Sequence, residues 1–258
     1  MKENHSEIQL VDKMQPERGF LETMLGLWSG KELSIPLFHR HMERMTRTLF
    51  PGSAPEPGLL LRTITRQCRQ GEILQGEILR GEIHGGSPRR LRIRLQYAPA
   101  VQEASPNKRE EDPDTIHLDI QIREFQPGKI RRAAAVELPD AEYSSKVADR
   151  RLFSELHRQY PGFDEIIITR NGYLSDGTFT NLILCPPTLP AHHHPCLTPS
   201  TPLLEGCRRR ELMAQGLLIT RPLHLRRLPH GWRLGFINAL NPPGQLGWVL
   251  PETLHVCG

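Results

Sequence analysis

The chain has 258 residues and a formal net charge of +4, a size that suits one or two domains with their own hydrophobic cores. No stretch reaches the roughly 18 apolar residues that a membrane helix needs, and residues 1–15 lack the apolar core of a signal peptide. We therefore expect a cytoplasmic protein without a membrane segment. The five cysteines are widely spaced and form no Cys-x-x-Cys pair, which predicts reduced thiols.

The first half of the chain predicts a small α+β domain. Its expected elements are, in order, a strand over Gly19–Leu27, a helix over Pro36–Phe50 with Pro36 in the first turn, a helix over Pro57–Arg69, and strands over Leu91–Tyr97 and Thr115–Phe125. The polar segment Val101–Asp114 predicts a loop between the last two strands. Because Pro127-Gly128 predicts a hinge, we place this domain at residues 1–126.

The second half, residues 127–258, predicts a larger, β-rich domain. Its expected elements are, in order, a strand over Ile130–Val136, a helix over Val147–Tyr160, strands over Asp164–Thr169, Tyr173–Asp176 and Phe179–Cys185, and a helix over Gly206–Gly216. Asn171-Gly172 lies between two of these strands and is a strong hairpin signal.

Lysine is scarce, because only six of the 33 basic residues are Lys. Lys146 is the only one after Lys129. Arg substitutes for Lys as a surface charge, but not as an amine that must lose its proton and attack a carbonyl. Lys146 is therefore a candidate nucleophile, and on composition alone a surface charge is an equal alternative.

Five segments carry polar residues in a distinctive order. They are Glu22-Thr23 with His41-Met-Glu-Arg44, then Tyr143-Ser-Ser-Lys146, then Gly172-Tyr-Leu-Ser-Asp176-Gly-Thr-Phe-Thr-Asn181, then Thr198 to Arg210, and finally Phe236-Ile-Asn238-Ala239-Leu240-Asn241. With this order and spacing, from about Phe20 to Asn241, the chain resembles the class IV aminotransferase family. That family includes branched-chain and D-amino-acid aminotransferases and aminodeoxychorismate lyase. The resemblance implies a two-domain α+β enzyme of fold type IV, with pyridoxal phosphate between the domains, that forms a homodimer whose subunits both contribute to each site.

The resemblance also implies roles for three side chains. Lys146 matches the Schiff-base lysine, and we expect burial to lower its pKa so that the neutral amine can attack. Asp176 matches the carboxylate that keeps the cofactor's ring nitrogen protonated. Arg44 matches the arginine that binds the phosphate, for which the planar fork of a guanidinium is suited.

Backbone groups are expected to complete the phosphate site. Gly206 and Cys207 begin a predicted helix, whose first amides are suited to an anion. The run Asn238, Ala239 and Leu240 is expected to form the other side of the same cradle.

Three residues depart from the family pattern. Asp176 stands where the family usually has Glu, Leu25 where it often has Arg, and Arg151 where some transaminases have Tyr. Arg150 and the Asn238-Ala239-Leu240 run are more typical of the lyase branch. We therefore expect an aminodeoxychorismate lyase, which eliminates pyruvate to leave 4-aminobenzoate for folate synthesis, with a branched-chain or D-amino-acid aminotransferase as the alternative.

Two further sequence features, a histidine cluster and an arginine run, give only weak support for a metal-binding or a nucleic-acid-binding protein. His192–His194 and Cys196 lack the spaced pairs of a zinc site, so no metal is expected. The Arg208–Arg210 run accompanies no nucleic-acid-binding motif, so no nucleic-acid partner is expected. A non-catalytic member of the fold or a basic binding protein remains a remoter alternative, against which the retained Lys146 argues.

Overall fold

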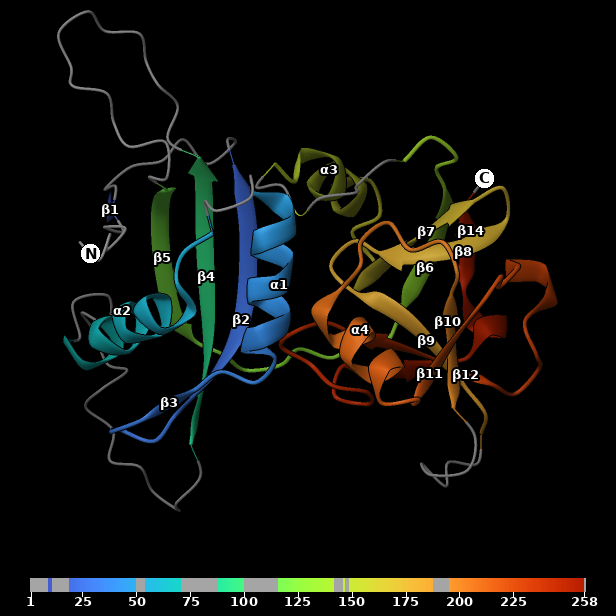
Figure 1. Cartoon of the computed structure of the whole chain (residues 1–258). Helices are drawn as coiled ribbons and strands as arrows, with labels where there is room; N and C mark the ends of the chain where they lie inside the picture. The colour runs from blue at the N-terminus through green and yellow to red at the C-terminus, as the bar shows by residue number, and fades with distance from the viewer. Residues whose placement is uncertain are drawn as a thin grey trace, which may run out of the picture. The chain divides into compact units, whose positions relative to one another are not determined.

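The computed structural model describes residues 9–10, 19–49, 54–70, 88–99, 116–141, 146, 149–187 and 195–257. It divides into two compact units, the first comprising Met1–Gln126 with Lys146–Asp149 and the second Pro127–Ser145 with Arg150–Gly258 (Figure 1). The division between Gln126 and Pro127 coincides with the predicted hinge. Lys146, which we had placed in the second domain, groups with the first unit.

The first unit contains a five-stranded sheet in the order β1-β5-β4-β2-β3. Strands β2, β4 and β5 are long and antiparallel, and α1 runs alongside β2 (Figure 1). The elements are β1 Gln9–Leu10, β2 Phe20–Trp28, β3 Leu33–Ser34, α1 Phe38–Thr48, α2 Pro57–Gln70, β4 Arg89–Pro99 and β5 Ile116–Glu124. The two helices and three long strands confirm the pattern predicted for this half of the chain, whereas segment 101–114 lies outside the described residues.

Alternation along β4 builds the core of the first unit. Leu91, Ile93 and Leu95 are buried, and Met45 of α1 and Ile64 of α2 belong to the same core cluster. Side chains two apart on a strand share a face, so the intervening arginines of β4 lie on its opposite face.

The start of α1 differs from the sequence prediction. The helix begins at Phe38, two residues after Pro36, so Pro36 does not occupy its first turn. Leu37 lies between them in the left-handed region, with φ of 65°, and this conformation cannot continue a right-handed helix.

The second unit contains a nine-stranded sheet whose main path is β11-β10-β9-β8-β7-β6-β14, with β12 pairing β9 and β13. The strands are β6 Ala133–Glu137, β7 Glu165–Arg170, β8 Tyr173–Gly177, β9 Asn181–Cys185, β10 Cys196–Pro199, β11 Leu218–Arg221, β12 Arg233–Ile237, β13 Trp248–Val249 and β14 His255–Cys257. The helices are α3 Arg151–Gln159 and α4 Cys207–Ala214, with single 3-10 turns at Leu225–Arg227 and Pro251–Thr253. The mixed content confirms the predicted α+β class.

The hairpin between β7 and β8 confirms the Asn171-Gly172 prediction. Asn171 and Gly172 have φ of 51° and 78°, the left-handed values that a tight two-residue turn requires. The Glu137 carboxylate fastens this turn, because it accepts hydrogen bonds from the Asn171 amide, from the Gly172 amide at 3.1 Å and from the Thr169 hydroxyl at 2.7 Å.

Helix α3 begins later than predicted. It starts at Arg151, whereas the sequence predicted a start at Val147, a residue outside the described ones. Ahead of the helix, the carbonyl of Lys146 accepts a hydrogen bond from the amide of Leu21 at 2.7 Å.

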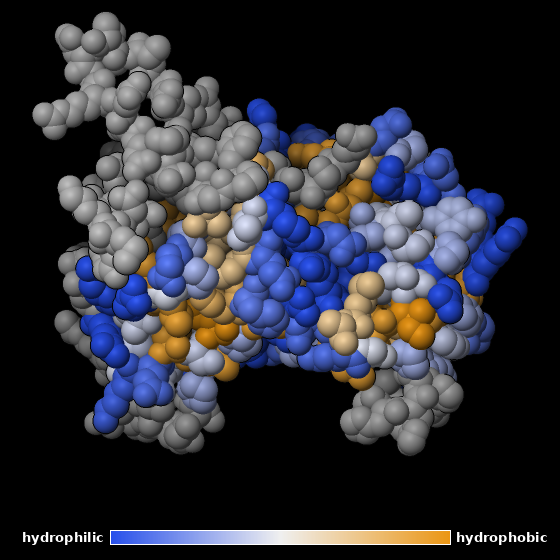
Figure 2. Space-filling view, viewed as in Figure 1, coloured by the Kyte–Doolittle hydropathy of each residue, from blue (hydrophilic) through white to orange (hydrophobic). Residues whose placement is uncertain are grey.

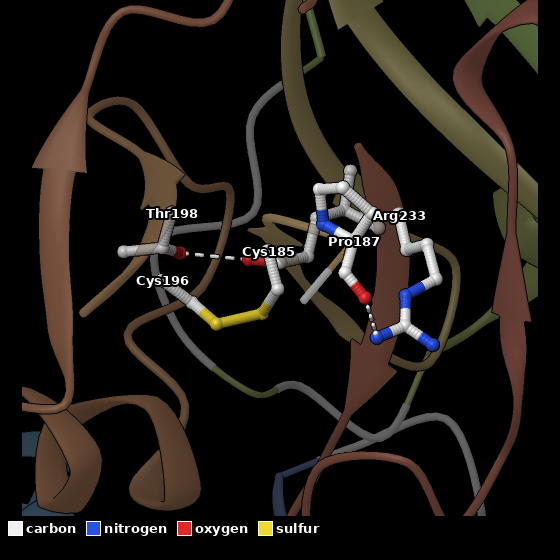
Figure 3. The surroundings of a disulfide bond; sticks show 6 residues. Cys185, Pro187, Cys196, Thr198 and Arg233 are labelled. Carbon is white, nitrogen blue, oxygen red and sulfur yellow. Dashed lines mark hydrogen bonds between the residues drawn. A yellow bond between two sulfur atoms is a disulfide. The ribbon is translucent and has the colours of Figure 1, made fainter. Parts of the chain in front are cut away.

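A disulfide joins Cys185 and Cys196 (Figure 3), so the prediction of five reduced thiols was wrong. The two residues end β9 and begin β10, whose register pairs Leu184 with Leu197. This pairing brings the two Cα atoms within 4.6 Å, a distance suited to a disulfide. Cys68, Cys207 and Cys257 remain thiols.

The surface is rich in polar groups. Figure 2 shows hydrophilic residues over much of the described face in that view. Among the described residues, no helix is both long and apolar enough to cross a membrane.

Candidate active site

A buried cluster of charged side chains lies between β2 and α1 in the first unit. Glu22 of β2 is completely buried and receives hydrogen bonds from two α1 residues. Arg44 donates from Nε to Glu22 Oε1 at 2.7 Å and from Nη2 to Oε2, and His41 lies with Nδ1 2.6 Å from Oε2. His41 and Arg44 are three residues apart on the helix, so both reach the strand from one face.

The electrostatics of this cluster favour an ionised Glu22. Burial by itself would raise the pKa of Glu22, but the charge of Arg44 and the hydrogen bonds from His41 and Arg44 outweigh it and lower the pKa to about 2. The cluster is therefore an ion pair at neutral pH, and the guanidinium of Arg44 is held in a fixed orientation.

Lys146 is connected to the same part of the first unit. Its carbonyl accepts the hydrogen bond from Leu21, the residue before Glu22, and its side chain is half-buried. Two residues predicted from separate motifs, Arg44 and Lys146, are thus both connected to β2. Its chain neighbours Ser145 and Val147 lie outside the described residues.

The second unit holds a second buried polar cluster around Asp176 on β8. Asp176 is 3% exposed and faces Asn181 across the β8–β9 pair. Asn181 Nδ2 donates to Asp176 Oδ1 at 2.9 Å, and the amide of Leu204 donates to Oδ2 at 2.9 Å. Asn181 Nδ2 also lies 2.9 Å from the carbonyl of Leu204, so one amide group links the strand to the loop before α4.

A cationic partner would stabilise the ionised form of Asp176. Burial raises its pKa to about 7, although the Asn181 and Leu204 hydrogen bonds and the charge of Arg209 act in the opposite direction. A buried carboxylate held mainly by neutral donors becomes more stable as an ion when a positive N–H group binds beside it.

Gly206 packs against the same cluster. It is the residue before α4, and a Cβ at this position would overlap Asn181 Oδ1, so a larger residue would displace the Asn181 side chain. Cys207 is the first residue of α4 and is buried, so the N-terminal end of the helix lies beside the Asp176 cluster. Arg209 Nε donates to Thr198 Oγ1 at 3.2 Å, which fixes this helix to β10.

The run Asn238, Ala239 and Leu240 forms a turn that is tied to α4. Asn238 Oδ1 accepts from the Leu240 amide at 3.0 Å and from the Asn241 amide at 3.0 Å. Arg208 Nη2 donates to the Ala239 carbonyl at 3.3 Å. One hydrogen bond thus connects the first turn of α4 to the Asn238 turn, whereas the anion site predicted for Gly206, Cys207 and the Asn238 turn stays a prediction.

Sequence reasoning missed several functional candidates in these clusters. Glu22 and His41 were noted only as motif residues, and their pairing with Arg44 depends on packing between a strand and a helix. Asn181 was likewise noted without its role as a hydrogen-bond donor to Asp176. Glu165 falls within the strand predicted over Asp164–Thr169, where an acidic residue beside three isoleucines is a signal of a buried polar contact.

Comparison with known proteins shows one related sequence and several related folds. An uncharacterized protein of Haemophilus influenzae is 34% identical over 122 residues, which are 47% of this chain and 62% of that protein. The chain thus spans less than two thirds of that relative. No family model matches the chain.

Solved structures match over most of the chain. The provisionally named 4-amino-4-deoxychorismate lyase of Haemophilus somnus has a TM-score of 0.61 at 23% identity, covering 86% of this chain and 96% of that one. The branched-chain aminotransferase of Thermoproteus uzoniensis has a TM-score of 0.60 at 14% identity, covering 93% and 78%. A fold IV transaminase of Curtobacterium pusillum has a TM-score of 0.58 at 13% identity, covering 94% and 83%.

The chain has the type IV fold. This finding confirms the fold that the motif resemblance implied. Within the type IV fold, the residues predicted from the motifs lie in two clusters, one around Glu22 and Arg44 and the other around Asp176, Asn181 and Gly206.

Proposed function

We propose that the protein is a pyridoxal-phosphate-dependent enzyme of the class IV aminotransferase family, and that its reaction is the lyase reaction on 4-amino-4-deoxychorismate. The assignment of the cofactor rests mainly on Asp176, a buried carboxylate whose two oxygens accept hydrogen bonds from Asn181 and Leu204. Such an acid suits the ring nitrogen of the cofactor, because a pyridinium N–H would add a positively charged donor to the neutral donors of Asn181 and Leu204.

The remaining donors fit the other parts of the cofactor. A guanidinium and the N-terminus of a helix are both suited to a phosphate, and the chain offers Arg44 and the first turn of α4. Lys146 would supply the amine that holds the cofactor. When bound, the cofactor supplies an electron sink for negative charge at the substrate's Cα.

Different residues of the chain are proposed to act on the ring nitrogen, on the phosphate and on the substrate's Cα. Asp176 keeps the ring nitrogen protonated, and Asn181 orients Asp176. Arg44 binds the phosphate while Glu22 fixes the direction of its fork. The amine of Lys146 would take the proton from the substrate's Cα and deliver a proton to the departing pyruvate, so it acts first as a general base and then as a general acid.

The lyase reaction is proposed on two grounds. Two of the solved structures with this fold, from Haemophilus somnus and Legionella pneumophila, are provisionally named 4-amino-4-deoxychorismate lyases. Arg150, the lyase-like residue, donates to the carbonyl of Thr178 in the segment between Asp176 and Asn181, which connects it to the proposed site. Arg151, at the position of the transaminase-like Tyr, is exposed.

We also propose a homodimer with no nucleic-acid partner. Light scattering of the purified protein should give twice the mass of the 258-residue chain, and a monomer with full activity would contradict this part of the proposal.

Labelling of Lys146 tests the cofactor assignment. Purified protein should absorb visible light, and borohydride should fix the cofactor to the peptide that contains Lys146. Lys146→Ala should lose both the labelled peptide and turnover. Lys129→Ala is the matched control, because Lys129 is exposed and its Nζ donates to the carbonyl of Gln245. A wild-type protein that stays colourless with added pyridoxal phosphate would contradict the assignment.

Substrate screening without a keto acid tests the reaction. A lyase should release pyruvate from 4-amino-4-deoxychorismate through many turnovers and keep its colour. A transaminase given a branched-chain or D-amino acid alone should bleach once and then stop. Stoichiometric bleaching without pyruvate release from 4-amino-4-deoxychorismate would replace the lyase with the aminotransferase.

A further inference from the structure

The segment Gly177–Thr180, which connects Asp176 on β8 to Asn181 on β9, is fastened to the buried carboxylate of Glu165. Glu165 is the first residue of β7 and is 0% exposed. Its Oε1 accepts from the Thr178 amide at 2.9 Å and from the Thr178 hydroxyl at 2.6 Å. Its Oε2 accepts from the Thr180 hydroxyl at 2.8 Å. One side chain thus holds both halves of this segment.

The packing around this carboxylate leaves little freedom. A Cβ on Gly177 would lie 2.7 Å from the Glu165 carboxylate, closer than atoms of this kind approach. The Gly177 amide donates to the Thr180 carbonyl at 2.9 Å, which closes a short turn. Gly177 follows Asp176 and Thr180 precedes Asn181, so Glu165 contacts a direct chain neighbour of each.

Other side chains bond to the same segment at single residues. Arg150 donates to the Thr178 carbonyl, and His157 Nε2 lies 2.7 Å from Thr178 Oγ1. Asn238 Nδ2 donates to the Phe179 carbonyl at 3.2 Å. Since the Thr178 hydroxyl donates to Glu165, it accepts from His157.

The cost of burying Glu165 argues that its hydrogen bonds serve a purpose. Burial raises the pKa of Glu165 to about 7, despite the hydrogen bonds from Thr178, Thr180 and the Ile166 amide that act in the opposite direction. A buried polar network that is fully hydrogen-bonded costs stability compared with apolar packing but specifies one geometry. Here the geometry specified is that of the connection between Asp176 and Asn181.

We propose that Glu165 is a positioning residue for Asp176: it holds Thr178 and Thr180 so that the Asp176 carboxylate stays aligned with Asn181 and can bind the cofactor's ring nitrogen. The inference rests on the proposed function, because it concerns the atom that Asp176 binds. Glu165 itself takes part in no chemical step.

The protonation of the ring nitrogen is the direct measurement. The holoenzyme is prepared with pyridoxal phosphate labelled with ¹⁵N in the ring, and the ¹⁵N chemical shift is followed against pH. Glu165→Ala should lower the pH at which the ring nitrogen deprotonates by about one unit, which corresponds to a tenfold weaker preference for the protonated form. Glu165→Gln should stay close to wild type, because its amide oxygen still accepts from Thr178 and the Thr180 hydroxyl can rotate to accept from the amide nitrogen.

Glu137→Ala is the matched control for a merely structural effect. Glu137 fastens the Asn171-Gly172 turn at the opposite end of β8 with the same kinds of hydrogen bond. Its loss should lower the denaturation midpoint and leave the ring-nitrogen titration unchanged. Thr180→Val removes one of the Glu165 hydrogen bonds with little change in volume, and it should shift the ring-nitrogen titration in the same direction by a smaller amount. This variant replaces Glu165→Ala in the test if Glu165→Ala does not fold.

A double-mutant cycle separates this inference from the proposed function. In the Asp176→Asn background, Glu165→Ala should cause no further shift in the ring-nitrogen titration, because the group on which Glu165 acts is gone. Equal shifts in both backgrounds, or equal shifts from Glu137→Ala and Glu165→Ala, would overturn the inference. If wild type binds the labelled cofactor and titrates like Glu165→Ala, the inference fails while the proposed function stands. If wild type does not bind the cofactor, the proposed function itself fails.

Discussion

Arg44 and Glu22 form a buried two-pronged ion pair, in which Nε lies 2.7 Å from Oε1 and Nη2 donates to Oε2. Both partners come from the first unit, one from α1 and one from β2. The pair limits how the guanidinium can turn, and it makes the two residues interdependent in stability as well as in the proposed phosphate binding.

Removal of Arg44 should therefore have two separable effects. Arg44→Ala leaves a buried carboxylate without its cation, which should destabilise the protein by about 3–5 kcal/mol in urea unfolding. It should also weaken pyridoxal phosphate binding by about 1.5–3 kcal/mol, the usual range for a charged hydrogen bond. Arg47→Ala on the exposed side of the same helix should do neither.

A second substitution tells these effects apart. Adding Glu22→Gln to Arg44→Ala should recover part of the stability, because the buried carboxylate left without its arginine is removed, but none of the cofactor affinity. Recovery of affinity in the double variant would mean that Arg44 does not touch the phosphate.

Loss of the Asp176 carboxylate should affect rate more than binding. Asp176→Ala removes the acid that we propose for the ring nitrogen, and protonation of that nitrogen stabilises negative charge at Cα. Turnover should fall by more than the cofactor dissociation constant rises, measured by steady-state kinetics and by cofactor titration. Asp140→Ala, at an exposed position, is the control. Full activity in Asp176→Ala would show that another acid serves the ring nitrogen.

Glu165 should make the folded state less stable as the pH rises. Its pKa is raised from 4.5 to about 7 in the folded protein, so between these values the folded chain keeps a proton that the unfolded chain releases. The stabilising contribution is complete below pH 4.5 and is lost as the pH passes about 7. The total is on the order of 3 kcal/mol.

Glu165→Gln isolates this effect, because glutamine does not ionise and Asp176, a buried carboxylate whose pKa is also raised, is unchanged. In urea unfolding between pH 5 and pH 8, the wild type should lose stability relative to Glu165→Gln as the pH rises. Parallel stability curves for the two proteins would show that Glu165 is ionised throughout this range.

The disulfide between Cys185 and Cys196 should be detectable by alkylation. Unfolded, unreduced protein should take up label at Cys68, Cys207 and Cys257 only, and reduction should add the other two. Because the bond closes a short loop, its reduction should lower stability by roughly 3 kcal/mol. A Cys185→Ser variant should be insensitive to the reductant, and labelling of all five cysteines before reduction would contradict the bond.

The sequence by itself was sufficient for the type of most elements and for the fold. Alternation along Leu91–Tyr97 and the Asn171-Gly172 turn depend on neighbours in the chain, so local patterns predict them well. Lys146, Arg44 and Asp176 were selected because their residue types and order match a known set of motifs. The predictions that Pro36 lies in the first turn of α1 and that α3 begins at Val147 were wrong, because the ends of helices depend on contacts that local patterns do not contain.

Only the tertiary structure decided which of these residues touch one another. The partners in each of three pairs, Glu22 with Arg44, Glu165 with Thr180, and Cys185 with Cys196, are separated along the chain, and their contacts depend on how strands, helices and loops pack. The same packing fixes the charge states, since burial raises the pKa of Asp176 whereas a buried arginine lowers that of Glu22. Spacing along the chain carries neither the distance to a partner nor the degree of burial, and these two quantities determine the energy of a charge inside a protein.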